Sequence, residues 1–196
     1  MIFFVLFSYL PMPMMRSGNS PTASAGCGQF LMVTREAYDK SGGHASFKDS
    51  MHDGVKMPRE VRKAGFHTDL FDGTDLVSVR MYRGLAQTWR GFTKNAYEGL
   101  GSMGLLVFFT VVHLLAHVLP WAIAMIAASK WMSGTLTADW RVAGVIAGVC
   151  VLLNVVQRSL LAIRFRQGIV PVILHPVGVL FMTVIQWYSL YLSRTN

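Results

Sequence analysis

Residues 105–128 read LLVFFTVVHLLAHVLPWAIAMIAA, a run in which no residue is Asp, Glu, Lys or Arg. The stretch without these four residue types extends from Gly99 to Ser129 and is 31 residues long. A helix needs about 20 mainly apolar residues to cross the hydrocarbon core of a bilayer. The stretch therefore predicts a transmembrane helix, and it separates a polar N-terminal half of the chain from an apolar C-terminal half.

Two further uncharged runs follow in the C-terminal half. Val142 to Gln157 has 16 residues, and we expect Arg158 and Arg164 to snorkel toward the interface, which extends this span to about Ile163. The run from Gln167 to Ser193 has 27 residues. The sequence therefore predicts three transmembrane helices within its last hundred residues.

The composition agrees with this division. Hydrophobic residues make up 53% of the 196 residues and charged residues 14%, against about 45–50% and about 25% in soluble domains. Asp139 is the only acidic residue after position 100. The basic residues lie around the spans rather than along one soluble face, so we expect no nucleic-acid partner. Cys27 and Cys150 do not form a disulfide framework.

Basic residues also predict the orientation of the spans, because short cytoplasmic loops are enriched in Lys and Arg. Arg83, Arg90 and Lys94 precede the first span, and Arg164 and Arg166 separate the second from the third. We therefore expect residues 25–98 to lie in the cytoplasm. The predicted organisation is an apolar interfacial segment and linker at 1–24, a cytoplasmic domain at 25–98 and a membrane domain at 99–196.

The N-terminal segment MIFFVLFSYLPMPMM is apolar but contains Pro11 and Pro13 and is only 15 residues long. This pattern favours a segment that lies in the membrane interface. The alternative is the core of a signal peptide cleaved near Ala23-Ser24-Ala25. No Lys or Arg precedes the apolar core, which is against that alternative.

The polar half predicts a small α/β domain. Gln29–Thr34 is an apolar run that suits a buried strand, and 76–82 alternates apolar and polar residues as a second strand does. Ser41–His44 is a loop with paired glycines. A helix is expected to start at Asp49-Ser50 and to run through Asp53 to Ala64, where Gly65 ends it; Pro58 does not suit the interior of this helix, and the alternative is a turn over its early part. A further helix is expected after the second strand.

The order of short motifs in this half resembles a known family. The motifs are Gly26-Cys27-Gly28-Gln29, Arg35-Glu36-Ala37-Tyr38, Gly42-Gly43-His44, His52-Asp53-Gly54, Arg80-Met81-Tyr82 and Gly91-Phe92-Thr93-Lys94-Asn95. Together they resemble the acceptor-side half of processive-type family 2 glycosyltransferases. The most similar branch is the membrane-anchored one that includes ceramide glucosyltransferases and bacterial hopanoid- and carotenoid-associated glycosyltransferases.

This resemblance implies a GT-A-like half-domain followed by three transmembrane helices in the bacterial inner (cytoplasmic) membrane. It also implies an inverting transfer of a sugar from a nucleotide-sugar donor to a lipid hydroxyl, with Asp53 as the base that takes the hydroxyl proton. His52 stands where the wider family has an acidic neighbour. Gly42, Gly43, Cys27, Gly28 and Gln29 are the other expected residues near the acceptor.

The family's Q-x-x-R-W motif is partly present at residues 87–91. Gln87 and Arg90 match it, whereas Gly91 stands in place of the Trp. The Arg90 guanidinium would then offset charge on the leaving diphosphate, and Trp89 or Phe92 would supply an apolar wall.

The donor-binding half of such an enzyme is missing from this chain, because no Asp-x-Asp motif occurs in it. We therefore expect the chain to be an incomplete, inactive fragment of a longer transferase. A divalent cation, Mg or Mn, is expected for the full-length parent, and no metal-ligand motif is expected here. The alternative function is a non-catalytic integral membrane protein whose cytoplasmic domain binds a partner or a lipid.

Three histidines lie within the predicted spans. His113 and His117 share one helix face in the first span, and His175 lies near the start of the third. Such residues can ligate haem or a metal, but hydrogen bonding inside a helix bundle is the commoner role. We expect Asn154, Gln157 and Gln186 to bond either between helices or to a lipid headgroup.

Overall fold

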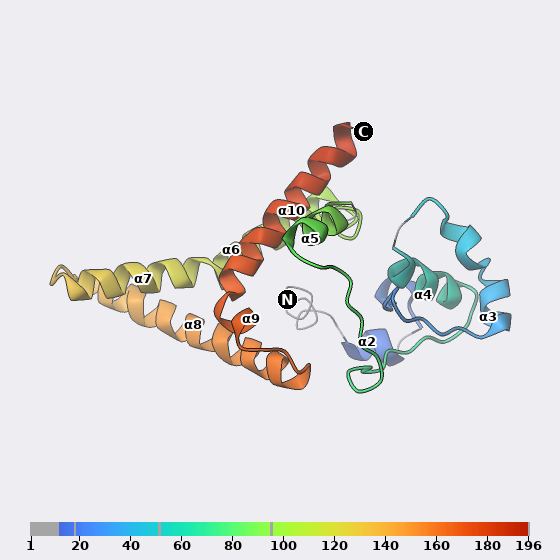
Figure 1. The fold of residues 1–196 in the computed structure, drawn as a ribbon, viewed down its shortest axis with the longest axis horizontal. Coiled ribbons are helices and arrows are strands. Elements are labelled where there is room, and N and C mark those ends of the chain that lie inside the picture. Colours follow the sequence, from blue (N-terminus) through green and yellow to red (C-terminus); the bar gives the residue numbers. More distant parts are fainter. Residues whose placement is uncertain (1–11, 18, 51, 95, 196) are drawn as a thin grey trace. The chain divides into compact units, whose positions relative to one another are not determined.

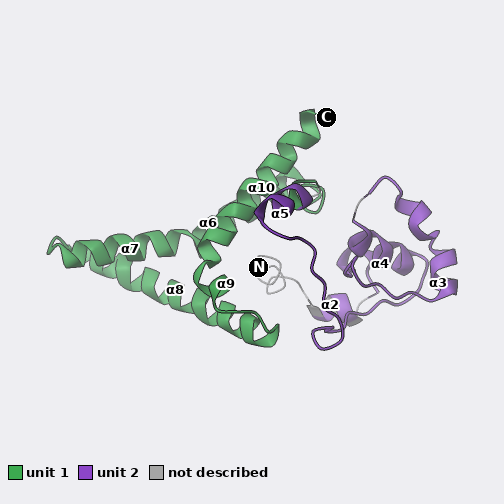
Figure 2. Cartoon of the chain, viewed as in Figure 1, with its two compact units in different colours: residues 1–6, 92–196 green, residues 7–91 purple. Residues whose placement is uncertain are grey.

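The computed structural model describes residues 12–17, 19–50, 52–94 and 96–195. Within these ranges every regular element is an α-helix or a 3-10 helix (Figure 1). The described residues form two compact units, the N-terminal unit of residues 12–91 and the membrane unit of residues 92–195 (Figure 2). Residues 1–11 of the predicted interfacial segment lie outside the described residues, and Met12–Ser17 form helix α2.

Helix α4 (Asp53–Lys63) is the centre of the N-terminal unit. Met57 and Val61 lie one turn apart on its buried face and pack against Ala37. The helix ends before Gly65, whose φ of +85° is readily adopted only by glycine. The predicted end of this helix is therefore confirmed to within one residue, whereas the helix starts at Asp53 and not at Asp49-Ser50. The other elements of the unit are η1 (Pro21–Ala23), α3 (Arg35–Lys40), η2 (Gly43–Phe47) and α5 (Leu85–Thr93), whose last two residues belong to the membrane unit.

The two predicted strands are not present. Gln29–Thr34 and 76–82 contain no strand, and the described residues form only an isolated bridge between Cys27 and Phe30. A strand is stable only when its backbone N–H and C=O groups pair with a neighbouring strand, and the described part of the chain supplies no such neighbour. The predicted α/β half-domain is thus wrong for these residues, and apolar side chains such as Met32 (78% exposed) and Leu76 (74% exposed) face outward.

Helix α3 was not expected from the sequence. The Thr34 hydroxyl caps it by accepting from the Ala37 N–H. Two ion pairs with i, i+4 spacing, Arg35–Asp39 and Lys40–Glu36, then run along its exposed side. These local signals were present in the sequence but lay beside a run that resembles a strand.

Arg62 of α4 binds the start of the described chain. Its side chain is 4% exposed. It donates to the carbonyls of Met15, Ser20 and Thr68 and to the Thr68 hydroxyl, the last at 2.7 Å. A buried guanidinium is tolerated when its N–H groups are hydrogen-bonded. Arg62 therefore fastens α2 and η1 to the helix that carries Asp53.

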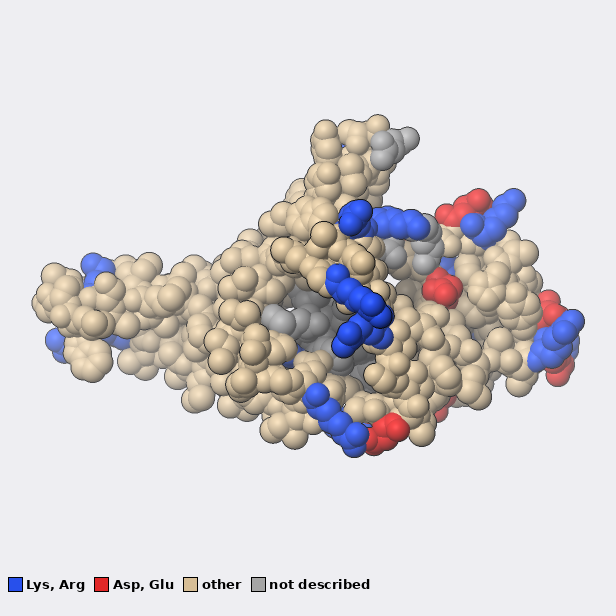
Figure 3. Space-filling view, in the orientation of Figure 1, with Lys and Arg blue, Asp and Glu red and all other residues tan. Residues whose placement is uncertain are grey.

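Three segments of the membrane unit are long and apolar enough to cross a membrane, which confirms the predicted number of spans. They are Met103–Met132, Ala138–Arg164 and His175–Thr195. The first consists of α6 (Met103–His117) and α7 (Leu119–Met132); the others are α8 (Ala138–Arg164) and α10 (His175–Thr195), which the short helix α9 (Val170–Ile173) precedes. The third span starts later than predicted because α9 and its flanking turns occupy 167–174. The visible surface of these helices carries few charged side chains (Figure 3).

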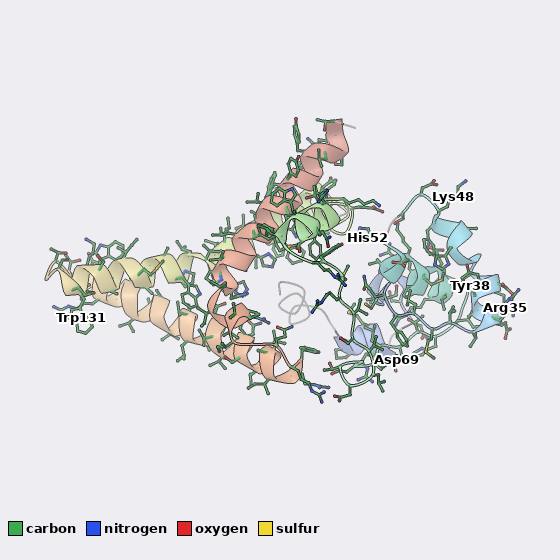
Figure 4. The ribbon with its side chains drawn as sticks, viewed as in Figure 1. Arg35, Tyr38, Lys48, His52, Asp69 and Trp131 are labelled. Atoms are coloured by element: carbon green, nitrogen blue, oxygen red, sulfur yellow. The ribbon has the colours of Figure 1, made fainter. Side chains whose placement is uncertain are left out.

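Helices α7 and α8 form an antiparallel hairpin, with Trp131 near its turn (Figures 1 and 4). Small residues let them approach closely, since a methyl group added to Gly144 would lie 2.7 Å from the Ala127 Cβ. Lys130 lies over the Trp140 ring at 5.4 Å. An aromatic and cationic end of this kind is typical of the membrane–water interface.

The first span is interrupted where α6 gives way to α7. Pro120 has no N–H, so the Ala116 carbonyl loses the helical partner that it would otherwise have. The Asn154 amide of α8 donates to this carbonyl at 2.9 Å, and also to the Cys150 carbonyl at 2.9 Å. The predicted interhelical role of Asn154 is therefore confirmed.

Arg158 of α8 does not snorkel. Its side chain is wholly buried, at 0% exposure, whereas Arg164 at the end of α8 is exposed. The prediction that Arg158 extends the second span by reaching the interface is thus wrong. Its guanidinium instead donates to the Gln167 Oε1 in the turn that follows α8.

Candidate functional site

The N-terminal unit contains a cavity of about 400 Å³ lined by His44, Phe47, Lys48, Ser50 and Asp53. Helix η2 supplies the first two of these residues, and α4 supplies Asp53 as its first residue. The cavity therefore contains a carboxylate together with an imidazole, an amine and a hydroxyl. Figure 4 marks Lys48 and His52, which precede α4.

Asp53 is held by the first turn of its own helix. Its Oδ1 accepts from the Gly54 N–H at 2.8 Å, and its side chain is half-buried. A carboxylate is favoured at this place because the N–H groups at a helix start carry partial positive charge. One oxygen of Asp53 is thus fixed and the group remains beside the cavity.

The loop that contains Gly26 and Gly28 lies directly against Asp53. A methyl group on Gly28 would lie 2.2 Å from the Asp53 Oδ1. A methyl group on Gly54 would lie 2.7 Å from the Gly28 nitrogen. Real Cβ atoms do not approach so closely, so glycine at 28 and 54 permits this contact between the loop and α4.

The double-glycine loop supports η2. Gly42 and Gly43 have φ angles of +78° and +53°, which residues with side chains rarely adopt. The Tyr38 ring covers Gly43, where a methyl group would lie 2.5 Å from it. The Tyr38 hydroxyl is 2.9 Å from the His44 Nδ1 and accepts from the His44 N–H. This arrangement orients His44, which lines the cavity.

The remaining predicted residues near Asp53 have other partners. The Cys27 thiol donates to the Gln29 Oε1 at 2.8 Å, and the Gln29 amide contacts the Met81 sulfur at 3.6 Å. His52 is the residue before α4, and its N–H donates to the Ser50 hydroxyl. None of these three side chains is among the residues that line the cavity.

Helix α5 carries the predicted Gln87, Trp89 and Arg90. The Gln87 Oε1 accepts from the Arg83 N–H at 2.8 Å, and the Arg90 Nε donates to the Ala86 carbonyl at 3.4 Å. Neither these two side chains nor Trp89 is among the residues that line the Asp53 cavity. The joint action of Asp53 and Arg90 stays a prediction.

The structure explains why residue 91 is Gly and not the Trp of the Q-x-x-R-W motif. A methyl group there would lie 2.2 Å from the Tyr82 ring. Tyr82 therefore occupies the space that a larger side chain at 91 would need. An aromatic residue is present at this place, but it comes from the segment before α5.

Lys48 and Phe47 were not expected at the site. They lie in the sequence between the double-glycine loop and Asp53, which is the signal that would have found them.

Among the described residues, no group of three or more His, Cys, Asp or Glu side chains is arranged to hold a metal ion. The divalent cation stays an expectation.

We compared the chain with protein-family models, curated proteins and solved structures, and none of them matches it.

Proposed function

We propose that this chain is the acceptor-side and membrane part of an inverting glycosyltransferase that acts on a lipid hydroxyl. One observation carries the proposal. Gly28, the double-glycine loop with its helix, and Asp53 belong to three separate motifs of the resemblance; Gly28 lies against Asp53, and Asp53 lines one cavity together with His44 and Phe47 of that helix. A shared cavity is what a reaction site requires of residues that are far apart in the sequence.

Asp53 acts as the general base in this proposal. The acceptor hydroxyl gives its proton to the free oxygen of Asp53 while its own oxygen bonds to the anomeric carbon of the sugar. The bond from that carbon to the diphosphate breaks, and the nucleoside diphosphate leaves with the electron pair. Lys48 and His44, which line the same cavity, stabilise the negative charge of the leaving group.

The lipid acceptor is held by the membrane unit. Three helices able to cross a bilayer keep the chain at the surface where lipid hydroxyl groups lie. The nucleotide-sugar donor, the Mg or Mn ion that would bind its diphosphate, and the cytoplasmic side of a bacterial inner membrane belong to the same proposal. Arg90 on α5 then acts on the diphosphate together with Lys48.

A second function is favoured by the exposed apolar side chains of the extended segments. Phe30, Met32, Leu76 and Val79 are between 42% and 78% exposed. An apolar surface of this kind suits the binding of a partner protein. The alternative is therefore a membrane protein whose N-terminal unit binds a partner without catalysing transfer.

The substitution Asp53→Asn separates the two functions. Asn keeps the hydrogen bond from the Gly54 N–H but cannot take a proton at neutral pH. We expect membranes that contain the complete gene product with Asp53→Asn to form glycolipid from labelled nucleotide-sugars at least about 100-fold more slowly. Asp49→Asn is the matched control, since Asp49 is exposed and does not line the cavity. Transfer at the normal rate by the Asp53 variant would remove the base and favour the partner-binding function.

A further inference from the structure

Polar side chains from three helices meet inside the membrane unit. They are His117 at the end of α6, Asn154 and Arg158 on α8, and His175 at the start of α10. All four are buried, with Arg158 at 0% and His175 at 2% exposure. Ionisable groups are costly inside a membrane and are found there mainly where they have a function.

The hydrogen bonds of Asn154 determine where the protons of the two histidines lie. The Asn154 amide nitrogen donates to the carbonyls of Ala116 and Cys150, so its Oδ1 is an acceptor and the His117 Nδ1 must donate to it. The His175 Nε2, 3.2 Å from the same Nδ1, is then an acceptor as well. His175 therefore carries its proton on Nδ1, and this atom has no hydrogen-bond partner among the described residues.

Arg158 has more donors than partners. Its Nη2 donates to the Gln167 Oε1 at 2.8 Å, while Nε and Nη1 have no hydrogen-bond partner in the part of the chain that the structure describes. Arg158 lies one turn along α8 from Asn154, and Asn154 bonds to the His117 ring that contacts His175. The groups left unsatisfied on Arg158 and His175 are therefore all N–H donors.

No carboxylate of the helix bundle neutralises Arg158. After Glu98, which precedes α6, the only acidic residue is Asp139. Asp139 lies on α8 19 residues before Arg158, and a rise of 1.5 Å per residue separates them by about 28 Å. A buried cation without a counter-charge costs several kcal/mol, and an anion from outside the chain would remove this cost.

Arg158 lies near one end of the membrane unit. It is six residues before Arg164, the last residue of α8, which corresponds to about 9 Å along the helix axis. Gln167 belongs to the turn that follows, and a methyl group on Gly168 in the same turn would meet no atom within 4 Å. A helix of 27 residues is about 40 Å long against a hydrocarbon core of about 30 Å, so Arg158 lies just inside the edge of the core, about one helical turn from the headgroup region that contains the lipid phosphates.

We propose that Arg158 and His175 form a binding site for one phosphate group, which approaches through the turn between α8 and α9. Phosphate fits these donors because a guanidinium and an imidazole N–H both make charge-assisted bonds to its oxygens. The phosphate belongs either to a lipid headgroup or to free inorganic phosphate. The site is separate from the Asp53 cavity and does not depend on the proposed transfer.

Binding to the detergent-purified chain tests this site. The probes are short-chain phosphatidic acid, the matching diacylglycerol without the phosphate, and inorganic phosphate, with native mass spectrometry and the unfolding temperature as readouts. We expect the chain to bind phosphatidic acid in preference to diacylglycerol. We expect Arg158→Gln to weaken binding by about 10- to 100-fold, because two or more charge-assisted bonds are lost.

Arg164→Gln is the matched control, since it removes a positive charge from the same helix at an exposed position. It should bind the probes as the unchanged chain does, and Arg158→Lys, which keeps the charge, should bind with intermediate affinity. Binding of inorganic phosphate that also depends on Arg158 would support a free-phosphate site, and binding of phosphatidic acid alone a lipid site. Equal binding by the unchanged chain and Arg158→Gln, equal binding of diacylglycerol, or no binding of either phosphate probe would overturn the proposal.

Discussion

The substitution Arg62→Met tests how strongly the N-terminal unit depends on one buried side chain. Met keeps most of the apolar stem but none of the four hydrogen bonds that Arg62 donates to Met15, Ser20 and Thr68. A hydrogen bond from a charged donor contributes about 1.5–3 kcal/mol, and the loss is smaller where water reaches the freed carbonyl. We therefore expect the free energy of unfolding to fall by about 3–5 kcal/mol.

This loss is large for a unit of this size. Residues 12–91 correspond to a total stability of about 4–12 kcal/mol at the usual stability per residue. With a urea dependence of about 1.5 kcal/mol per molar, the midpoint of unfolding should fall by about 2 M or more. Pulse proteolysis of the detergent-purified chain in urea measures this, with mass spectrometry to locate the cuts within 12–91.

Lys63→Met is the matched control for Arg62→Met. Lys63 is the next residue of α4, and its ammonium pairs only with Glu60 of the same helix among the described contacts, with the Lys63 side chain 55% exposed. Such a pair contributes about 0.5 kcal/mol or less, so the midpoint should barely change. Equal midpoints for the two variants would refute the conclusion that Arg62 fastens α2 and η1 to α4.

Two further predictions concern the same unit. Gly28→Ala places a methyl group 2.2 Å from the Asp53 Oδ1. We therefore expect glycolipid formation by the complete gene product to fall at least about 10-fold, and the free energy of unfolding of the N-terminal unit to fall by about 1–3 kcal/mol. In the control Gly73→Ala the methyl group meets only Phe71 at 3.8 Å, so neither quantity should change. The pKa of Asp69 lies below its ordinary value of 3.8, because its carboxylate accepts from the Leu70 N–H and pairs with Arg16. Its stabilising contribution is therefore present above pH 3.8 and is lost as the pH falls through the lowered pKa. Asp69→Asn should be less stable than the unchanged chain at neutral pH in urea unfolding, and a difference that persists at pH values well below the lowered pKa would contradict this.

The spans and the central helix were predictable because their signals are local. A run of uncharged residues about 20 long can satisfy its backbone in a bilayer only as a helix, so the sequence of 105–128 was sufficient by itself. The end of α4 was equally local, since Gly65 adopts a φ that other residues avoid. Thr34 and the charge pairs of α3 were local signals of the same kind, although the apolar run before them obscured the helix.

The prediction of two strands was wrong for the opposite reason, because strand formation depends on residues that are not local. Gln29–Thr34 has the composition of a strand, but a strand requires a partner whose position no local pattern specifies. The gathering of Gly28, His44 and Asp53 was expected only through the resemblance of the motifs. Lys48 also lines this cavity, although it belongs to none of the motifs.

The burial of Arg158 is the feature that the sequence predicted least well. An Arg near the end of an apolar run normally reaches the interface, and nothing in the residues around it indicates otherwise. Its side chain is nevertheless fully buried, and its guanidinium bonds to Gln167 in the turn that follows α8. Hydrophobic length and turn geometry act over a few neighbouring residues, so the sequence by itself specified the helices. Which polar side chains become buried depends on how separate segments pack against one another, so only the tertiary structure determined their burial.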